Sequence, residues 1–113
     1  GKLEINEGML VENVVAQMLK AAGHELFFYS KSSKLNADDR MEVDFLISKP
    51  VITTRHNISP IEVKSGKSYT ITSLEKMRKK FSNSLAESYV LHTGDVEEKD
   101  GVMYLPLYMT GLL

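Results

Sequence analysis

The sequence contains no cysteine. This absence excludes disulfide bonds, thiolate zinc sites, iron–sulfur clusters and a cysteine nucleophile. An excess of one charge is also missing, because 14 Lys and Arg residues face 15 Asp and Glu residues, for a net charge of −1. The chain is therefore not a polycation that coats nucleic acid through bulk charge. No apolar run approaches the roughly 18 residues of a membrane span, and the charged start lacks a signal-peptide pattern, so we expect a cytoplasmic protein without a membrane partner.

What is present is the composition of an ordinary soluble domain. The chain has 113 residues, of which 42% are hydrophobic and 26% are charged. This length and composition predict a single domain, residues 1–113, with its own hydrophobic core. Because the chain begins with Gly1 and not with Met, we expect it to be part of a longer protein.

Hydrophobic periodicity predicts a mixed α/β domain. An apolar stripe at helical spacing over residues 9–22 predicts a first helix, and Thr72 or Ser73 is expected to cap a second one. The buried side of the second helix is predicted to carry Leu74, Met77, Phe81 and Leu85. Strands are expected at 25–30, 41–47, 58–64, 88–92 and 102–105, polar loops at 31–40 and 94–101, an ambiguous segment at 51–57 and a packed apolar tail at 107–113. The predicted order is α-β-β-β-α-β-β.

One spacing points to chemistry. Asp44 lies on one predicted strand, and Glu62 and Lys64 lie on the next, where a period of two places both on the same face. If the two strands pair as a hairpin, two carboxylates and an ammonium group share one spot. Carboxylates that close repel each other unless a cation lies between them, and oxygen ligands suit Mg²⁺ or Mn²⁺. The lysine can orient a water or stabilise a developing phosphate charge, so the set fits phosphodiester hydrolysis.

A simpler interpretation of the same residues stays open at this point. Acidic residues on the polar face of an alternating strand are usually solvated, and Glu-x-Lys is a common surface ion pair. The apolar residues that flank Asp44 and Glu62 favour the catalytic interpretation, because they place the charged side chains in an apolar setting.

The pattern Asp44…Glu62-Val63-Lys64, between a leading and a following helix, resembles the core of the PD-(D/E)xK nuclease superfamily. The resemblance implies a restriction-endonuclease-like αβββαβ core with a central mixed sheet flanked by helices. It also implies that Asp44, Glu62 and the Val63 carbonyl hold the metal and that Lys64 positions the water. Glu12 matches the acidic residue that many members add from the first helix, although a solvated helix glutamate is an equal alternative. Val43 replaces the proline of the motif name.

Four short segments also resemble the uncharacterised domain at the C-terminus of many prokaryotic AAA-type ATPases. They are Asn6–Asn13 with Val15–Gln17, Glu42–Ile47, Ile61–Ser65 and Leu105–Tyr108. This resemblance implies that an ATPase module of the same full-length protein is a partner. The second helix lacks the Gln-x-x-x-Tyr element of RecB-like nucleases, which favours a Holliday-resolvase-like or restriction-like site.

One basic cluster is a candidate for phosphate contacts, with a solvated helix face as the alternative. Its members are Lys67, Lys76, Arg78, Lys79 and Lys80, and the loop cations Lys31, Lys34 and Arg40 are a weaker second group. Nucleotide binding by this chain is excluded, because the phosphate loop ending at Ser65-Gly66-Lys67-Ser68 would need glycine at position 61, where Ile61 stands. The three histidines have no ligand spacing, so a zinc site is not expected.

The sequence therefore predicts a magnesium- or manganese-dependent DNA endonuclease-like domain attached to an AAA-type ATPase. The alternative is a non-catalytic interaction or structural module of that ATPase, which docks DNA, a partner or a subunit. A homo-oligomer is compatible with either function.

Overall fold

A computed structural model describes residues 7–31, 41–48 and 58–113. The predicted ambiguous segment 51–57 lies outside the described residues, as do Lys34 and Arg40. The elements in chain order are α1 (Glu7–Ala21), β1 (Leu26–Lys31), β2 (Met41–Ser48), β3 (Ile58–Val63), α2 (Thr72–Lys80), β4 (Ser88–His92), β5 (Glu97–Lys99), β6 (Val102–Pro106) and the 3-10 helix η2 (Leu107–Leu112).

The strands form one six-stranded mixed sheet in the order β1-β2-β3-β4-β6-β5. The pairs β1-β2 and β2-β3 are antiparallel, the pairs β3-β4 and β4-β6 are parallel, and β5 is antiparallel to β6. The predicted α/β class, with a central mixed sheet and helices on it, is confirmed.

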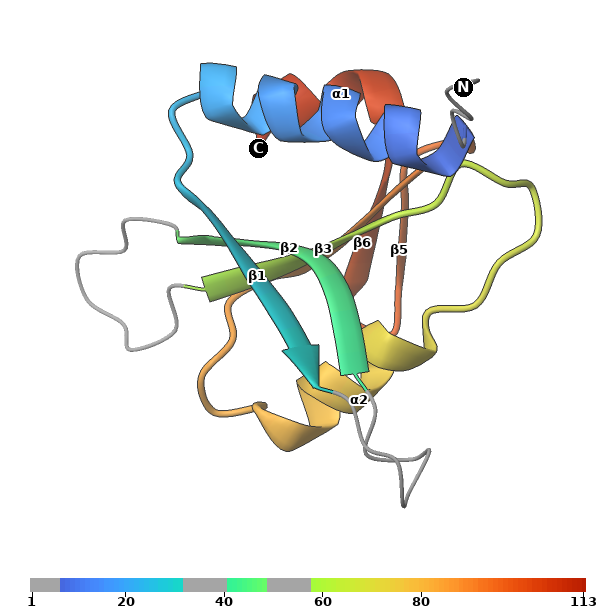
Figure 1. The fold of residues 1–113 in the computed structure, drawn as a ribbon. Coiled ribbons are helices and arrows are strands. Elements are labelled where there is room, and N and C mark those ends of the chain that lie inside the picture. The colour runs from blue at the N-terminus through green and yellow to red at the C-terminus, as the bar shows by residue number, and fades with distance from the viewer. Residues whose placement is uncertain (1–6, 32–40, 49–57) are drawn as a thin grey trace, which may run out of the picture.

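The helices cover the two faces of this sheet (Figure 1). On one face, Val15 and Leu19 of α1 are buried in a core that includes Ile61 and Val63, and η2 packs beside α1. On the other face, Leu74 and Met77 are the buried residues of α2. The predicted buried side of α2 is confirmed, with Phe81 and Leu85 partly buried around Met77. Since side chains alternate along β3, Glu62 points away from α1, toward the face that α2 covers.

Two local predictions are wrong. Residues 94–101 are not only a solvated loop, because β5 forms an exposed edge strand there. Ile71, not Thr72 or Ser73, is the N-cap residue of α2, and no side chain caps the helix. The predicted first helix is confirmed as α1, and its apolar stripe extends beyond its buried side, because Leu10 is 53% exposed and Val14 is 49% exposed.

The packed tail is confirmed, since Thr110 of η2 is fully buried and His24 Nε2 lies 2.6 Å from the main-chain oxygen of Leu113. None of the helices in the described part of the chain has the length and apolar character needed to span a membrane.

Candidate active site

The strands β2 and β3 separate where the candidate site lies. Their pairing runs from Ser48 opposite Ile58 to Phe45 opposite Ile61 and ends there, two residues before β3 does. Beyond that point the Asp44 side chain bridges the two strands, because Asp44 Oδ2 accepts a hydrogen bond from the main-chain N–H of Val63 at 2.7 Å. The Asp44 carboxylate thus takes the place of a main-chain carbonyl as the acceptor of the Val63 N–H. The main chain of the neighbouring strand therefore fixes the position of this carboxylate.

Glu62 and Lys64 form an ion pair beside this bridge. Lys64 Nζ lies 3.3 Å from Glu62 Oε2, and the predicted shared face of the two residues is confirmed. The Lys64 main chain is held as well, because its N–H donates to the Leu91 carbonyl of β4 at 2.8 Å. The main chain of Lys64 is therefore fixed by β4, while its side chain contacts Glu62, two residues earlier on β3.

Glu62 is an unusual carboxyl group. The residue is 3% exposed, and its second oxygen, Oε1, is buried without a hydrogen-bond partner. Burial, and next the charge of Asp44, raise the pKa of Glu62 to about 7, although the Lys64 ammonium acts in the opposite direction. A buried oxygen without a partner is unfavourable, so this carboxylate is poised to accept a cation or a proton.

Asp44, Glu62 and Lys64 open into one cavity of 260 Å³, together with Thr70, Thr72 and Ser73. Thr72 and Ser73 begin α2, so the positive end of that helix faces the same cavity and favours anionic groups there. The predicted convergence of Asp44, Glu62 and Lys64 is therefore confirmed.

The structure does not bring every predicted site residue to this cavity. Glu12, on α1, does not line it, and no three acidic or histidine side chains gather as a metal site within the described ranges. The helix α1 packs on the opposite face of the sheet, which accounts for this separation. The Val63 N–H holds the Asp44 carboxylate by a hydrogen bond. A role of the Val63 carbonyl as a metal ligand stays a prediction.

A match to a family model shows which protein family the chain belongs to. Residues 7–109 match a domain of unknown function, DUF4143. The chain belongs to the DUF4143 family. No curated protein and no solved structure matches it. The family description names no activity, so the chemistry of this DUF4143 domain has to be argued from its own side chains.

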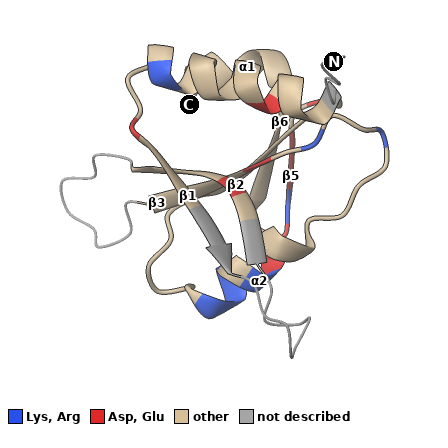
Figure 2. Cartoon of the chain, viewed as in Figure 1, with Lys and Arg blue, Asp and Glu red and all other residues tan. Residues whose placement is uncertain are grey.

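The predicted basic cluster of this DUF4143 domain lies on and before α2. Arg78, Lys79 and Lys80 occupy its last turn, where cations are favoured by the helix dipole, and Figure 2 shows Lys and Arg gathered on this helix. Lys67, Lys79 and Lys80 are exposed. Lys80 Nζ also lies 5.6 Å from the ring centre of Phe81. The helix is nine residues long, so Lys80 at its end lies about 12 Å along the helix axis from Thr72, which lines the cavity.

The DUF4143 domain has a second cavity beside the first, which the sequence did not predict. Tyr69 and Tyr104 are part of its wall. Behind them lies His92, which is buried. Its Nδ1 lies 2.9 Å from the Tyr69 hydroxyl and its Nε2 lies 2.8 Å from the Asp95 carbonyl oxygen, so both ring nitrogens have partners. No periodicity joins segments so far apart in sequence, which is why the pattern could not reveal this cavity.

Proposed function

We propose that this DUF4143 domain is a metal-dependent phosphodiesterase acting on DNA, with a restriction-endonuclease-like site made of Asp44, Glu62 and Lys64. The observation that carries the proposal is the buried, unpartnered Oε1 of Glu62 in a cavity that also holds Asp44 and Lys64. The Asp44 carboxylate adds a second negative charge beside the Glu62–Lys64 ion pair, and like charges at one site are unfavourable unless a further cation compensates them.

The donor set fits a divalent cation. Mg²⁺ prefers oxygen ligands and is commonly bound by one or two carboxylates, with waters and substrate phosphate completing its shell. Asp44 and Glu62 supply two carboxylates, and a cation would satisfy the oxygen of Glu62 that lacks a partner. Mg²⁺ or Mn²⁺ would supply Lewis-acid polarisation of a phosphate oxygen and a more acidic bound water.

The protein side chains have distinct tasks in this proposal. Asp44 is held in place by the Val63 N–H, so the reacting groups meet in a fixed geometry. Lys64 can orient the attacking water and stabilise negative charge on the scissile phosphate. The start of α2 adds its positive dipole end to the same cavity. The cations at the far end of α2 would contact phosphates further along the strand.

From the resemblance we also propose a restriction-endonuclease-like core, a metal-ligand role for the Val63 carbonyl and an ATPase module of the same full-length protein as a partner. Glu12 is left out of the proposed site, because it does not line the cavity. The order of one helix, three strands and a second helix, followed by β4, agrees with that core.

The test combines metal binding with DNA cleavage. Calorimetric titration of Mg²⁺ and Mn²⁺ into the wild type should give a saturable signal, and the wild type should nick supercoiled or branched DNA when either metal is present. Glu62→Gln should lose both properties. Glu98→Gln is the matched control, because Glu98 is an exposed glutamate of β5 that does not line the candidate cavity. Equal behaviour of the two variants would contradict the proposal.

The rival function is a non-catalytic interaction module. The observation that favours it is the exposed apolar side of α1, where Met9 is 65% exposed beside the exposed Leu10 and Val14. If the wild type neither binds metal nor cleaves DNA, this function replaces the enzymatic one.

A further inference from the structure

The larger cavity lies directly beside the candidate active site. Its volume is 530 Å³, against 260 Å³ for the active-site cavity, and the two share Thr70 and Thr72. Pockets that receive small organic groups have volumes of about 300–1,000 Å³. A DNA strand whose phosphate lies at Lys64 therefore has room for one of its bases within the adjoining cavity.

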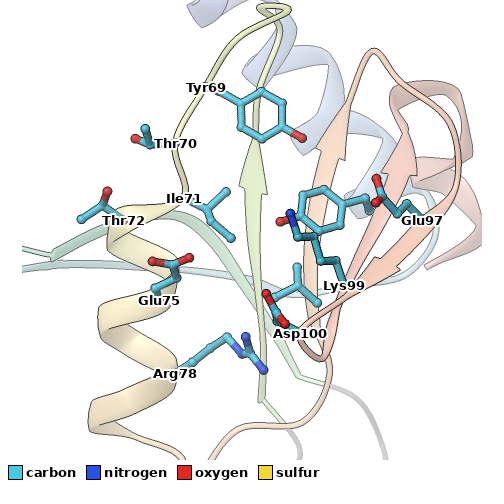
Figure 3. A pocket seen from close by; sticks show the side chains of 11 residues that line it. Tyr69, Thr70, Ile71, Thr72, Glu75, Arg78, Glu97, Lys99 and Asp100 are labelled. Atoms are coloured by element: carbon cyan, nitrogen blue, oxygen red, sulfur yellow. The ribbon is translucent and has the colours of Figure 1, made fainter.

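The walls of this cavity come from two sides (Figure 3). The segment from Tyr69 to Thr72 and the helix α2 form one side, and the hairpin of β5 and β6 forms the other. Arg78 extends from α2 toward the hairpin, and a Cβ at Gly101 would lie 2.7 Å from its Nη2. Since Gly101 also has a positive φ of 79°, glycine at this position both forms the turn and leaves space for the guanidinium group.

The cavity combines aromatic rings with charges of both signs. Its ionisable residues are Glu75, Glu97 and Asp100 against Arg78 and Lys99, and its rings are Tyr69 and Tyr104. Burial, followed by the charges of Glu75, Glu97 and Asp100, raises the pKa of Tyr104, and the Arg78 guanidinium acts in the opposite direction. The carboxylates on these walls disfavour a phosphate group, while Arg78 and Lys99 disfavour a cationic side chain of a peptide.

An uncharged, flat group with donors and acceptors on its edge fits these walls. A nucleobase has a π-face that can stack on tyrosine, and its exocyclic amine can donate to a carboxylate. Guanine also presents the acceptor pair O6 and N7, which arginine recognises. The interaction between Tyr69 and His92 holds one ring in place from behind.

Resting on the proposed function, we propose that this cavity receives one unpaired base of the DNA strand bound at the active site, with guanine preferred. The domain would then act on single-stranded or branched DNA, because a base inside a duplex cannot leave its stack without the loss of stacking and pairing energy.

Binding without cleavage tests the inference separately from the proposed function. Fluorescein-labelled single strands of thymidine, with or without one central guanine, are titrated with the wild type in EDTA, and binding is followed by fluorescence anisotropy. The strand with guanine should bind more tightly. Tyr104→Leu should weaken its binding by about tenfold, the loss expected for one stacked base. Tyr108→Leu is the control, because Tyr108 is 81% exposed on η2 and does not line the cavity.

A second variant protects the test against misfolding of Tyr104→Leu. Glu75 and Glu97 are both exposed, so Glu75→Gln/Glu97→Gln should fold normally and lose the guanine preference. Equal binding of both strands by the wild type would overturn the inference, as would tighter binding of an arginine-rich peptide than of either strand. If DNA is cleaved but Tyr104→Leu and the double variant bind like the wild type, the cavity inference fails and the proposed function stands. If the wild type prefers guanine, the variants lose this preference and no DNA is cleaved, the cavity inference stands and the proposed function fails.

Discussion

The Asp44 carboxylate accepts a hydrogen bond from the main-chain N–H of Val63, at 2.7 Å from Oδ2 to N. The bond lies where β2 and β3 no longer pair, so one side chain maintains the contact between two strands that have separated. Asp44 therefore has a structural task in addition to its proposed chemical one, and the two tasks can be separated by substitution.

Asp44→Asn and Asp44→Ala should differ in stability but not in activity. The asparagine keeps an oxygen acceptor for the Val63 N–H, whereas alanine leaves this donor unpaired, which typically costs about 1–3 kcal/mol. We expect Asp44→Ala to have the lower free energy of unfolding in urea titrations. Both variants should lose metal-dependent cleavage, because neither retains the negative charge. A cleaving Asp44→Asn would remove Asp44 from the metal site.

Glu62 should make the stability of the domain depend on pH. Its pKa of about 7 in the folded state exceeds the ordinary value of 4.5, so the folded state binds the proton more tightly than the unfolded chain does. The free energy of unfolding should therefore fall as the pH rises from 4.5 to about 7, and level off above that.

Glu62→Gln should remove this dependence. The free energy of unfolding of the variant, relative to that of the wild type, should rise by up to about 3 kcal/mol between pH 4.5 and about pH 7. Urea titrations of both proteins at a series of pH values measure the difference, with Glu98→Gln as the control that follows the wild type. Parallel curves for wild type and Glu62→Gln would show that Glu62 titrates normally.

Lys64→Ala should be destabilised and then rescued by metal. The variant leaves Asp44 and Glu62 together without their counter-charge, and since Lys64 is 28% exposed we expect a loss of about 1–3 kcal/mol, below that of a fully buried pair. Mg²⁺ that binds the folded state would restore stability by mass action. Thermal unfolding with and without Mg²⁺ checks this, beside a nicking assay in which the variant should be inactive.

Lys20→Ala is the control for that experiment, because Lys20 is an exposed lysine in the last turn of α1. It should unfold and cleave like the wild type. A Lys64→Ala variant that is destabilised and indifferent to Mg²⁺, beside a wild type inert toward DNA, would leave Lys64 as a structural ion-pair partner.

Lys79 and Lys80 should contribute to DNA affinity through phosphates. Lys79→Gln/Lys80→Gln should weaken binding of all sequences alike and reduce the slope of log K against log salt by up to about one unit per lost contact. Affinity measured over a salt series checks this, with Lys20→Gln as the control. An unchanged slope would identify the two lysines as a solvated helix face.

The sequence predicted those parts of the structure that depend on local periodicity. Alternation identified β2 and β3, and because a strand has a period of two it also placed Glu62 and Lys64 on one face. The position of Asp44 beside them depended on hairpin pairing of the two strands, which a period alone does not establish. The edge strand β5 was missed, since its residues Glu97–Lys99 are all charged and exposed and are held only by pairing with β6.

The position of Glu12 shows a different limit. A helical wheel places a residue relative to the buried stripe of its own helix, but it does not say which face of the sheet the helix covers. The cavity beside the candidate active site could not be predicted for a similar reason, because its residues come from segments that only the tertiary fold brings together.

The place of the candidate site in the sheet also has a kinetic consequence. Asp44 lies in the antiparallel meander β1-β2-β3, whereas the Lys64 main chain is held by β4, which pairs with β3 across α2. Contacts between distant segments form later in folding than local hairpins, because their loops must close first. We therefore expect the site to be completed after the rate-limiting step. Substitutions at Lys64 should then accelerate unfolding in stopped-flow experiments and leave the refolding rate almost unchanged, whereas substitutions at Asp44, whose hydrogen bond lies within the local β2–β3 hairpin, should also slow refolding.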